Sequence, residues 1–175
     1  MENEDRERRV GEPGPEQILT AIEQQRGAGE QQIAEQERVQ YLGFYLGQEV
    51  YGLPLRQLRE VERVARIRSV PGAPASVAGL VNLRGEIICA LNPKAILSCS
   101  ETTPAETSFL VVLRGSEEPL GLVVDSIADI YAISPDQIES PLATWPPERA
   151  QFFVGTVRVQ EALMGVLDLE TVIAP

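Results

Sequence analysis

Acidic side chains are the only groups in this sequence that could support acid–base catalysis. The chain contains no histidine, which removes Ser-His and Cys-His nucleophile pairs and the usual zinc sites. Asp125, Asp129 and Asp168 are the candidates for a pair of cooperating carboxylates. Asp129 follows a predicted strand and Asp168 precedes a predicted helical turn, so a turn or capping role explains each of them better. We therefore expect no catalytic residue, no cofactor site and no metal site.

A second group of residues with interpretable chemistry is a cluster of arginines between positions 56 and 84. It comprises Arg56, Arg59, Arg63, Arg66, Arg68 and Arg84. Arginine is favoured at planar, bidentate contacts and at protein interfaces. Glu60 and Glu62 lie within the cluster, so internal ion pairs could use part of it, although exposed pairs contribute only about 0–1 kcal/mol each. The cluster predicts a docking surface for a protein partner.

The overall charge narrows the class of partner and the location of the protein. The 175 residues carry a net charge of −11 at pH 7, and the pI is near 4.5. Nucleic acids and anionic membranes both require a basic face, so neither is an expected partner. No run of about 18 apolar residues occurs, and the N-terminus lacks the apolar core of a signal peptide. With only two cysteines, Cys89 and Cys99, we expect a cytoplasmic protein without membrane insertion or a disulfide framework.

The stretch from Gly79 to Leu91 has the alternation of a β-hairpin. Its odd-numbered positions are apolar, namely Val81, Leu83, Ile87, Cys89 and Leu91. Even positions carry Asn82, Arg84 and Glu86, which predicts one polar face on both arms. The bend is expected at residues 84–86, because Gly85 can adopt a positive φ angle without steric cost. An ordinary solvated strand face is the alternative to a binding face.

Short apolar segments on either side of this stretch predict a mostly β protein. Residues 41–46 and 49–55 read as one hairpin, and residues 109–113 and 120–124 as another. Residues 54–62 have apolar positions at a spacing of three, which predicts a short helix or an irregular turn. The alternation continues over residues 64–70, before a Pro-Gly turn.

The sequence also contains an internal repeat. Residues 79–97 can be laid on residues 155–173 with Gly79 on Gly155, and residues 52–61 on residues 121–130. Two copies of one supersecondary unit are therefore expected, over about 41–97 and 108–173. Each would form a small antiparallel sheet, and closure into a barrel would remove its exposed edges. We predict two small β-barrels packed around a shared core.

Residues 1–40 differ in composition from the rest of the chain. They are rich in Glu, Gln, Gly and Pro, with ten acidic and five basic residues and no aromatic residue before Tyr41. Residues 15–25 could form a short helix, but isolated helices below about 12–15 residues are marginal in water. We predict a flexible extension, and a helix that docks on a partner is the alternative.

Several of these motifs resemble the CheW family of chemotaxis coupling proteins, from about Tyr41 to the C-terminus. The segment Asn82-Leu83-Arg84-Gly85, preceded by Gly79-Leu80-Val81, resembles the family signature. Glu60-Val61 and Leu167-Asp168-Leu169 resemble two further family motifs. Cys89 and Asn92 depart from the proline and aspartate usual in the family.

The resemblance implies two five-stranded, SH3-like barrels and a non-catalytic adaptor within a chemosensory array. Its expected partners are the cytoplasmic tip of methyl-accepting chemoreceptors and the regulatory domain of a CheA-type histidine kinase. The protein-binding residues that it implies are Glu60, Val61, Asn82, Leu83, Arg84 and Gly85. A related module for another kinase pathway, such as pilus-driven motility, is the alternative, with residues 1–40 giving partner specificity. A carboxylate-dependent enzyme remains a third hypothesis.

Overall fold

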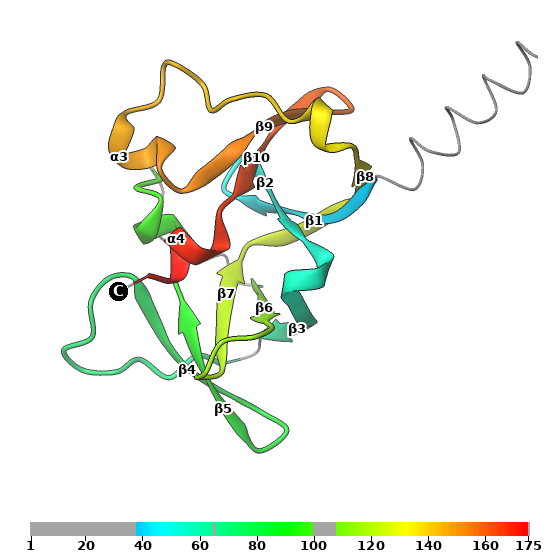
Figure 1. The fold of residues 1–175 in the computed structure, drawn as a ribbon. Helices are drawn as coiled ribbons and strands as arrows, with labels where there is room; N and C mark the ends of the chain where they lie inside the picture. The colour runs from blue at the N-terminus through cyan, green and yellow to red at the C-terminus, as the bar shows by residue number, and fades with distance from the viewer. Residues whose placement is uncertain (1–37, 65, 100–107, 175) are drawn as a thin grey trace, which may run out of the picture. The chain divides into compact units, whose positions relative to one another are not determined.

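The structure is a computed structural model that describes residues 38–64, 66–99 and 108–174 (Figure 1). Ten strands occur in this part of the chain: β1 (Val39–Leu46), β2 (Glu49–Pro54), β3 (Leu58–Val64), β4 (Val77–Leu83), β5 (Glu86–Leu91), β6 (Ser108–Leu113), β7 (Leu120–Val124), β8 (Ser126–Ile133), β9 (Phe153–Val159) and β10 (Ala162–Leu167). The helices are short: η1 (Leu55–Gln57), α2 (Pro93–Ile96), η2 (Pro135–Gln137), α3 (Pro147–Ala150) and α4 (Leu169–Ile173). No helix of the described residues is long and apolar enough to cross a membrane.

The strands form two five-stranded sheets, as predicted. Sheet I has the order β8-β1-β2-β10-β9, and sheet II has the order β3-β6-β7-β5-β4. Neighbouring strands are antiparallel except for β10 with β2 and β5 with β7, which are parallel. The fold is therefore mostly β, with two sheets of equal size and related strand order.

The internal repeat is visible in the order of the elements. Strands β1 to β5 followed by α2 correspond to β6 to β10 followed by α4. However, the two repeats exchange their first hairpins, so that β1 and β2 join sheet I while β6 and β7 join sheet II. The expectation that each repeat forms its own antiparallel sheet is therefore wrong, because each sheet contains strands from both repeats.

A shared core lies between the two sheets, as predicted. Phe44 and Leu53 of sheet I belong to the same buried cluster as Val111 and Leu122 of sheet II. The C-cap residue of α2 and two residues of α4 also belong to this cluster. Each sheet also has a smaller core of its own. Burial of this apolar surface joins the two sheets into one unit, from Arg38 to the C-terminus.

Two of the expected elements differ from the structure. The short helix or irregular turn expected over residues 54–62 is a single turn of 3-10 helix, η1, and the chain then enters β3 at Leu58. The alternation over residues 64–70 does not continue as a strand, because β3 ends at Val64 and, among the described residues that follow up to position 70, only Arg68 forms a bridge, with Leu80. Spacing-three patterns are ambiguous in short segments, and pairing with β6 decides in favour of a strand here.

The predicted N-terminal extension, residues 1–40, lies outside the described residues up to position 37. Its last residues include Val39 and Gln40, which belong to β1 and pair with β8. The expected linker between the repeats, residues 98–107, is described only at Ser98 and Cys99.

Candidate functional site

The β4–β5 hairpin carries the signature motif at its turn. Leu83 pairs with Glu86, so the turn consists of Arg84 and Gly85 alone. Both have positive φ angles, 51° and 90°, as the two central residues of a type I′ turn require. The Asn82 side chain accepts a hydrogen bond from the Gly85 N–H at 2.9 Å. Asn82 therefore fixes the turn, and the predicted bend is confirmed and narrowed to two residues.

The two arms of this hairpin do not keep the expected odd–even pattern. Residues directly opposite in an antiparallel pair share a face, and the two-residue turn places Val81 opposite Ile88. Ile88 is fully buried, while the side chain of Ile87, predicted to face inward, is 52% exposed. The expectation of odd-numbered residues inside is right for β4 and wrong for β5. As a result, Asn82 and Glu86 lie on opposite faces of the hairpin.

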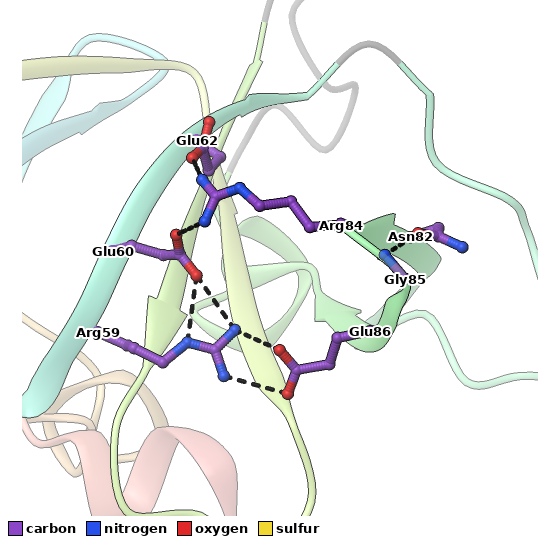
Figure 2. A network of polar contacts seen from close by, with 7 residues as sticks. All are labelled: Arg59, Glu60, Glu62, Asn82, Arg84, Gly85 and Glu86. Atoms are coloured by element: carbon purple, nitrogen blue, oxygen red, sulfur yellow. Dashed lines mark hydrogen bonds and ion pairs between the residues drawn. The ribbon is translucent and has the colours of Figure 1, made fainter.

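An alternating network of arginines and glutamates connects the hairpin to β3 (Figure 2). Arg84 donates hydrogen bonds to Glu60 at 2.9 Å and to Glu62. Arg59 donates two hydrogen bonds to the carboxylate of Glu86, at 3.1 and 2.7 Å. Its Nε also donates to Glu60 at 3.2 Å, so that Glu60 is shared by both arginines. Internal pairing within the arginine cluster, left open by the sequence, therefore occurs.

The hydrogen bonds of this network shift the pKa values of two of its residues. The hydrogen bonds from Arg59 lower the pKa of Glu86, and the same contacts raise the pKa of Arg59. Arg84 is the most accessible member, since 67% of its side-chain surface is exposed, against 37% for Arg59 and 43% for Glu86. Arg84 can therefore contact another molecule from its present position.

The structure brings together four of the six residues implied by the resemblance. Glu60, Asn82, Arg84 and Gly85 lie at the network or at the turn beside it. Val61 is exposed on β3, while Leu83 is half-buried and packs against the core of sheet II. Leu83 therefore supports the hairpin from inside.

The sequence did not identify three residues as members of this ion-pair network, namely Arg59, Glu62 and Glu86. The signal that could have found them is the alternation of charge along β3, from Arg59 to Arg63, opposite a charged turn. Opposite charges attract where two strands lie side by side, but the sequence does not specify that β3 lies beside this turn.

A groove of about 630 Å³ lies beside this hairpin, between β3 and β4. Arg63, Arg66 and Arg68 contribute its basic side chains, while Leu80 and Ile87 contribute exposed apolar surface. Arg63 stacks over the Phe109 ring at 5.5 Å. The groove therefore combines apolar contact area with positive charge, on a protein that is acidic overall.

The three carboxylates considered for catalysis have separate structural roles. Asp125 pairs with the buried Lys94 at 2.7 Å and accepts a hydrogen bond from the N–H of Gly47. Asp129 accepts a hydrogen bond from the N–H of the next residue. Asp168 precedes α4 and accepts a hydrogen bond from Thr171. Within the described residues, no group of His, Cys, Asp and Glu side chains could hold a metal ion.

Comparison with known proteins supports the family resemblance that the hairpin motif indicated. A family model for the CheW-like domain matches residues 40–174. The chain belongs to the CheW-like family. The resemblance seen in the sequence is therefore confirmed, together with the function it implied, an adaptor that couples receptors to CheA in chemotaxis.

Individual CheW proteins align over most of the chain. The chemotaxis protein CheW of Treponema pallidum is 32% identical over 137 residues, 76% of this chain and 81% of that protein. The chemotaxis protein CheW of Helicobacter pylori is 26% identical over 161 residues, 90% of this chain and 96% of its own length. Among solved structures, the scaffolding protein TtCheW from Thermoanaerobacter tengcongensis has a TM-score of 0.70 at 22% identity, covering 79% of this chain and 89% of its own. This structural match supports the two-sheet fold.

Proposed function

We propose that this CheW-like chain is a non-catalytic adaptor that binds the cytoplasmic tip of a chemoreceptor and the regulatory domain of a CheA-type histidine kinase. It would act in the cytoplasm, recruited to receptor arrays at the membrane. The observation that carries the proposal is the exposed Arg84, presented on a rigid turn that the signature residues Asn82 and Gly85 build. Such a side chain, held outside the core, contributes more to recognition than to folding.

The groove beside the hairpin supplies the rest of the surface that a docking partner needs. Ile87 and Leu80 expose apolar area next to Arg66 and Arg68, and no ion pair involves these two arginines within the described residues. Interfaces commonly combine an apolar centre with arginine. We expect the kinase's regulatory domain to dock here, through an interface of about 1,000–1,600 Å².

Replacement of Arg84 by glutamate tests the proposal. R84E should weaken binding to at least one of the two partners about tenfold or more, since it places a like charge beside Glu60 and Glu62 and removes a charged contact. Thermal stability should fall by no more than about 1 kcal/mol for each of the two lost ion pairs, because exposed pairs contribute about 0–1 kcal/mol. Isothermal titration calorimetry against the kinase regulatory domain and against a soluble receptor-tip fragment measures both affinities.

The matched control is Arg114→Glu, which makes the same charge change at an exposed position in the β6–β7 turn, outside the network. It should bind both partners like the wild type. If R84E also binds both partners like the wild type, Arg84 is not a partner contact. If the wild-type chain binds neither partner, the adaptor function itself is wrong.

A further inference from the structure

Along the seam where the β4–β5 hairpin meets β3, the backbone hydrogen bonds lie only beyond the end of β3, at the bridge between Arg68 and Leu80, within the described residues. In sheet II, β3 and β4 are the two outer strands, and β3 pairs only with β6 among the described strands. Side-chain ion pairs from Arg59 and Arg84 cross this seam instead (Figure 2). The position of the hairpin turn therefore depends on side-chain contacts in addition to its own core packing.

The two arginines at this seam make different kinds of contact. Arg59 forms a bidentate ion pair with Glu86, the geometry in which a surface pair contributes most. Arg84 makes a single contact to each of Glu60 and Glu62 and is the more exposed of the two. Arg59 and Glu86 therefore contribute most to holding β5 against β3.

If Arg84 left the network, both of its carboxylate partners would still have a polar contact or access to water. Glu60 would keep its hydrogen bond from Arg59, which uses the other carboxylate oxygen. Glu62 is partly exposed, so water can solvate it when Arg84 leaves. Loss of Glu86 would remove both hydrogen bonds that join Arg59 to the hairpin and leave Arg59 only its contact to Glu60 on β3.

The corresponding seam of sheet I shows that the fold does not require these ion pairs. The turn between β9 and β10 also has two residues, with Gln160 at a φ angle of 51° in place of Arg84, whereas Glu161, in place of Gly85, has no positive φ angle. The positions equivalent to Arg59, Glu62 and Glu86 carry Ala128, Tyr131 and Ala162. No ion pair joins β8 to this turn within the described part of the chain. The seam of sheet I forms without an ion pair among the described residues, although Asp129 occupies the position equivalent to Glu60, so the network in sheet II has another role.

We propose that the Arg59–Glu86 ion pair is a clasp that positions the hairpin, so that Arg84 can exchange Glu60 and Glu62 for a carboxylate of the docking partner. Arg59 and Glu86 are thus positioning residues, which act on binding through Arg84. This inference rests on the proposed function, in which Arg84 contacts a partner. It names the chemistry of the partner at that contact, an Asp or Glu side chain.

Three variants of the full chain test the clasp: Glu86→Gln, Arg84→Gln and the combination of both. Hydrogen exchange of the backbone amides of residues 82–88 should become faster in E86Q and should stay at the wild-type rate in R84Q. Affinity for the kinase regulatory domain should fall in E86Q by about threefold or more. In the combined variant, E86Q should add little to the loss caused by R84Q, because its effect passes through Arg84.

Glu161→Gln is the matched control, since Glu161 is an exposed carboxylate at the equivalent turn of sheet I, outside the network. It should leave both the exchange rates and the affinity unchanged. The clasp is wrong if E86Q exchanges and binds like the wild type, or if R84Q also accelerates exchange of the hairpin. Additive losses in the combined variant would mean that Glu86 contacts the partner itself. If R84Q binds both the kinase regulatory domain and the receptor-tip fragment like the wild type, the proposed contact of Arg84 fails, while the exchange rates of the free protein still decide whether the clasp exists.

Discussion

At the scale of single residues, the hydroxyl group of Tyr51 joins strand β2 to α3. Tyr51 is 1% exposed and its ring stacks near those of Phe44 and Phe153. Its hydroxyl donates to Glu49 at 2.6 Å and accepts a hydrogen bond from Arg149 at 3.0 Å. Tyr51→Phe should lower the free energy of unfolding by about 0.5–1.5 kcal/mol, because it removes two hydrogen bonds while Arg149 and Glu49 still pair with each other. Urea denaturation measures this loss.

The same hydroxyl predicts a dependence of stability on alkaline pH. Burial, and then the hydrogen bond to Glu49, raise the pKa of Tyr51 well above its ordinary value of 10.0. A raised pKa in the folded state stabilises the protein below the ordinary pKa, and this contribution is lost as the pH rises above about 10. The difference in stability between wild type and Tyr51→Phe should therefore shrink above that pH. A difference that stays constant from pH 8 to 11 would contradict the assignment.

At the scale of elements, two glycines at equivalent positions of the repeat allow a chain segment to cross a strand closely. A Cβ atom at Gly79 would collide with the carbonyl oxygen of Arg68, and one at Gly155 with that of Glu139. Backbone hydrogen bonds hold both crossings, between Arg68 and Leu80 and between Glu139 and Thr156. Gly79→Ala and Gly155→Ala should each cost about 1–3 kcal/mol, because backbone atoms must move. Thermal or urea unfolding of each variant measures the cost.

Gly72→Ala separates the effect of close approach from that of the backbone angle. Gly72 has a φ angle of +79°, but no atom lies within 4 Å of the position of an added Cβ. Its replacement should cost only about 1 kcal/mol or less, from backbone strain alone. At Gly155, where the φ angle is not in the left-handed region, crowding alone should give the larger loss. A larger loss in Gly72→Ala than in Gly155→Ala would overturn this interpretation.

The elements also show which part of the site could be predicted from the sequence. Gly85 between two charged residues correctly predicted the hairpin and its bend, because turn chemistry is local. The identity of the inward residues on β5 depended on the length of the turn, since one residue more or less reverses the faces of the second arm. Likewise, the contact between Arg59 and Glu86 joins residues 27 positions apart, and local alternation of charge does not specify it.

At the scale of the whole molecule, the repeat predicted two similar sheets but not their composition. Sequence offsets identify which strands are equivalent, whereas the exchange of hairpins depends on which edges meet in three dimensions. The structure pairs β2 with β10 and β7 with β5, so each sheet is closed by strands from the opposite repeat. Two sheets built separately from one repeat each would have given the same sequence pattern.

This exchange predicts that neither repeat folds alone. A fragment of residues 38–99 contains only three strands of sheet II and two of sheet I, and its share of the central core would be exposed to water. Small sheets without a covering partner are marginal at best. Circular dichroism should show no cooperative unfolding for residues 38–99 or for residues 100–175. An equimolar mixture of the two fragments should recover cooperative unfolding and form a one-to-one complex, because every broken strand pairing can form again between the chains. A cooperative transition in either fragment alone would mean that one repeat can complete a sheet with its own strands.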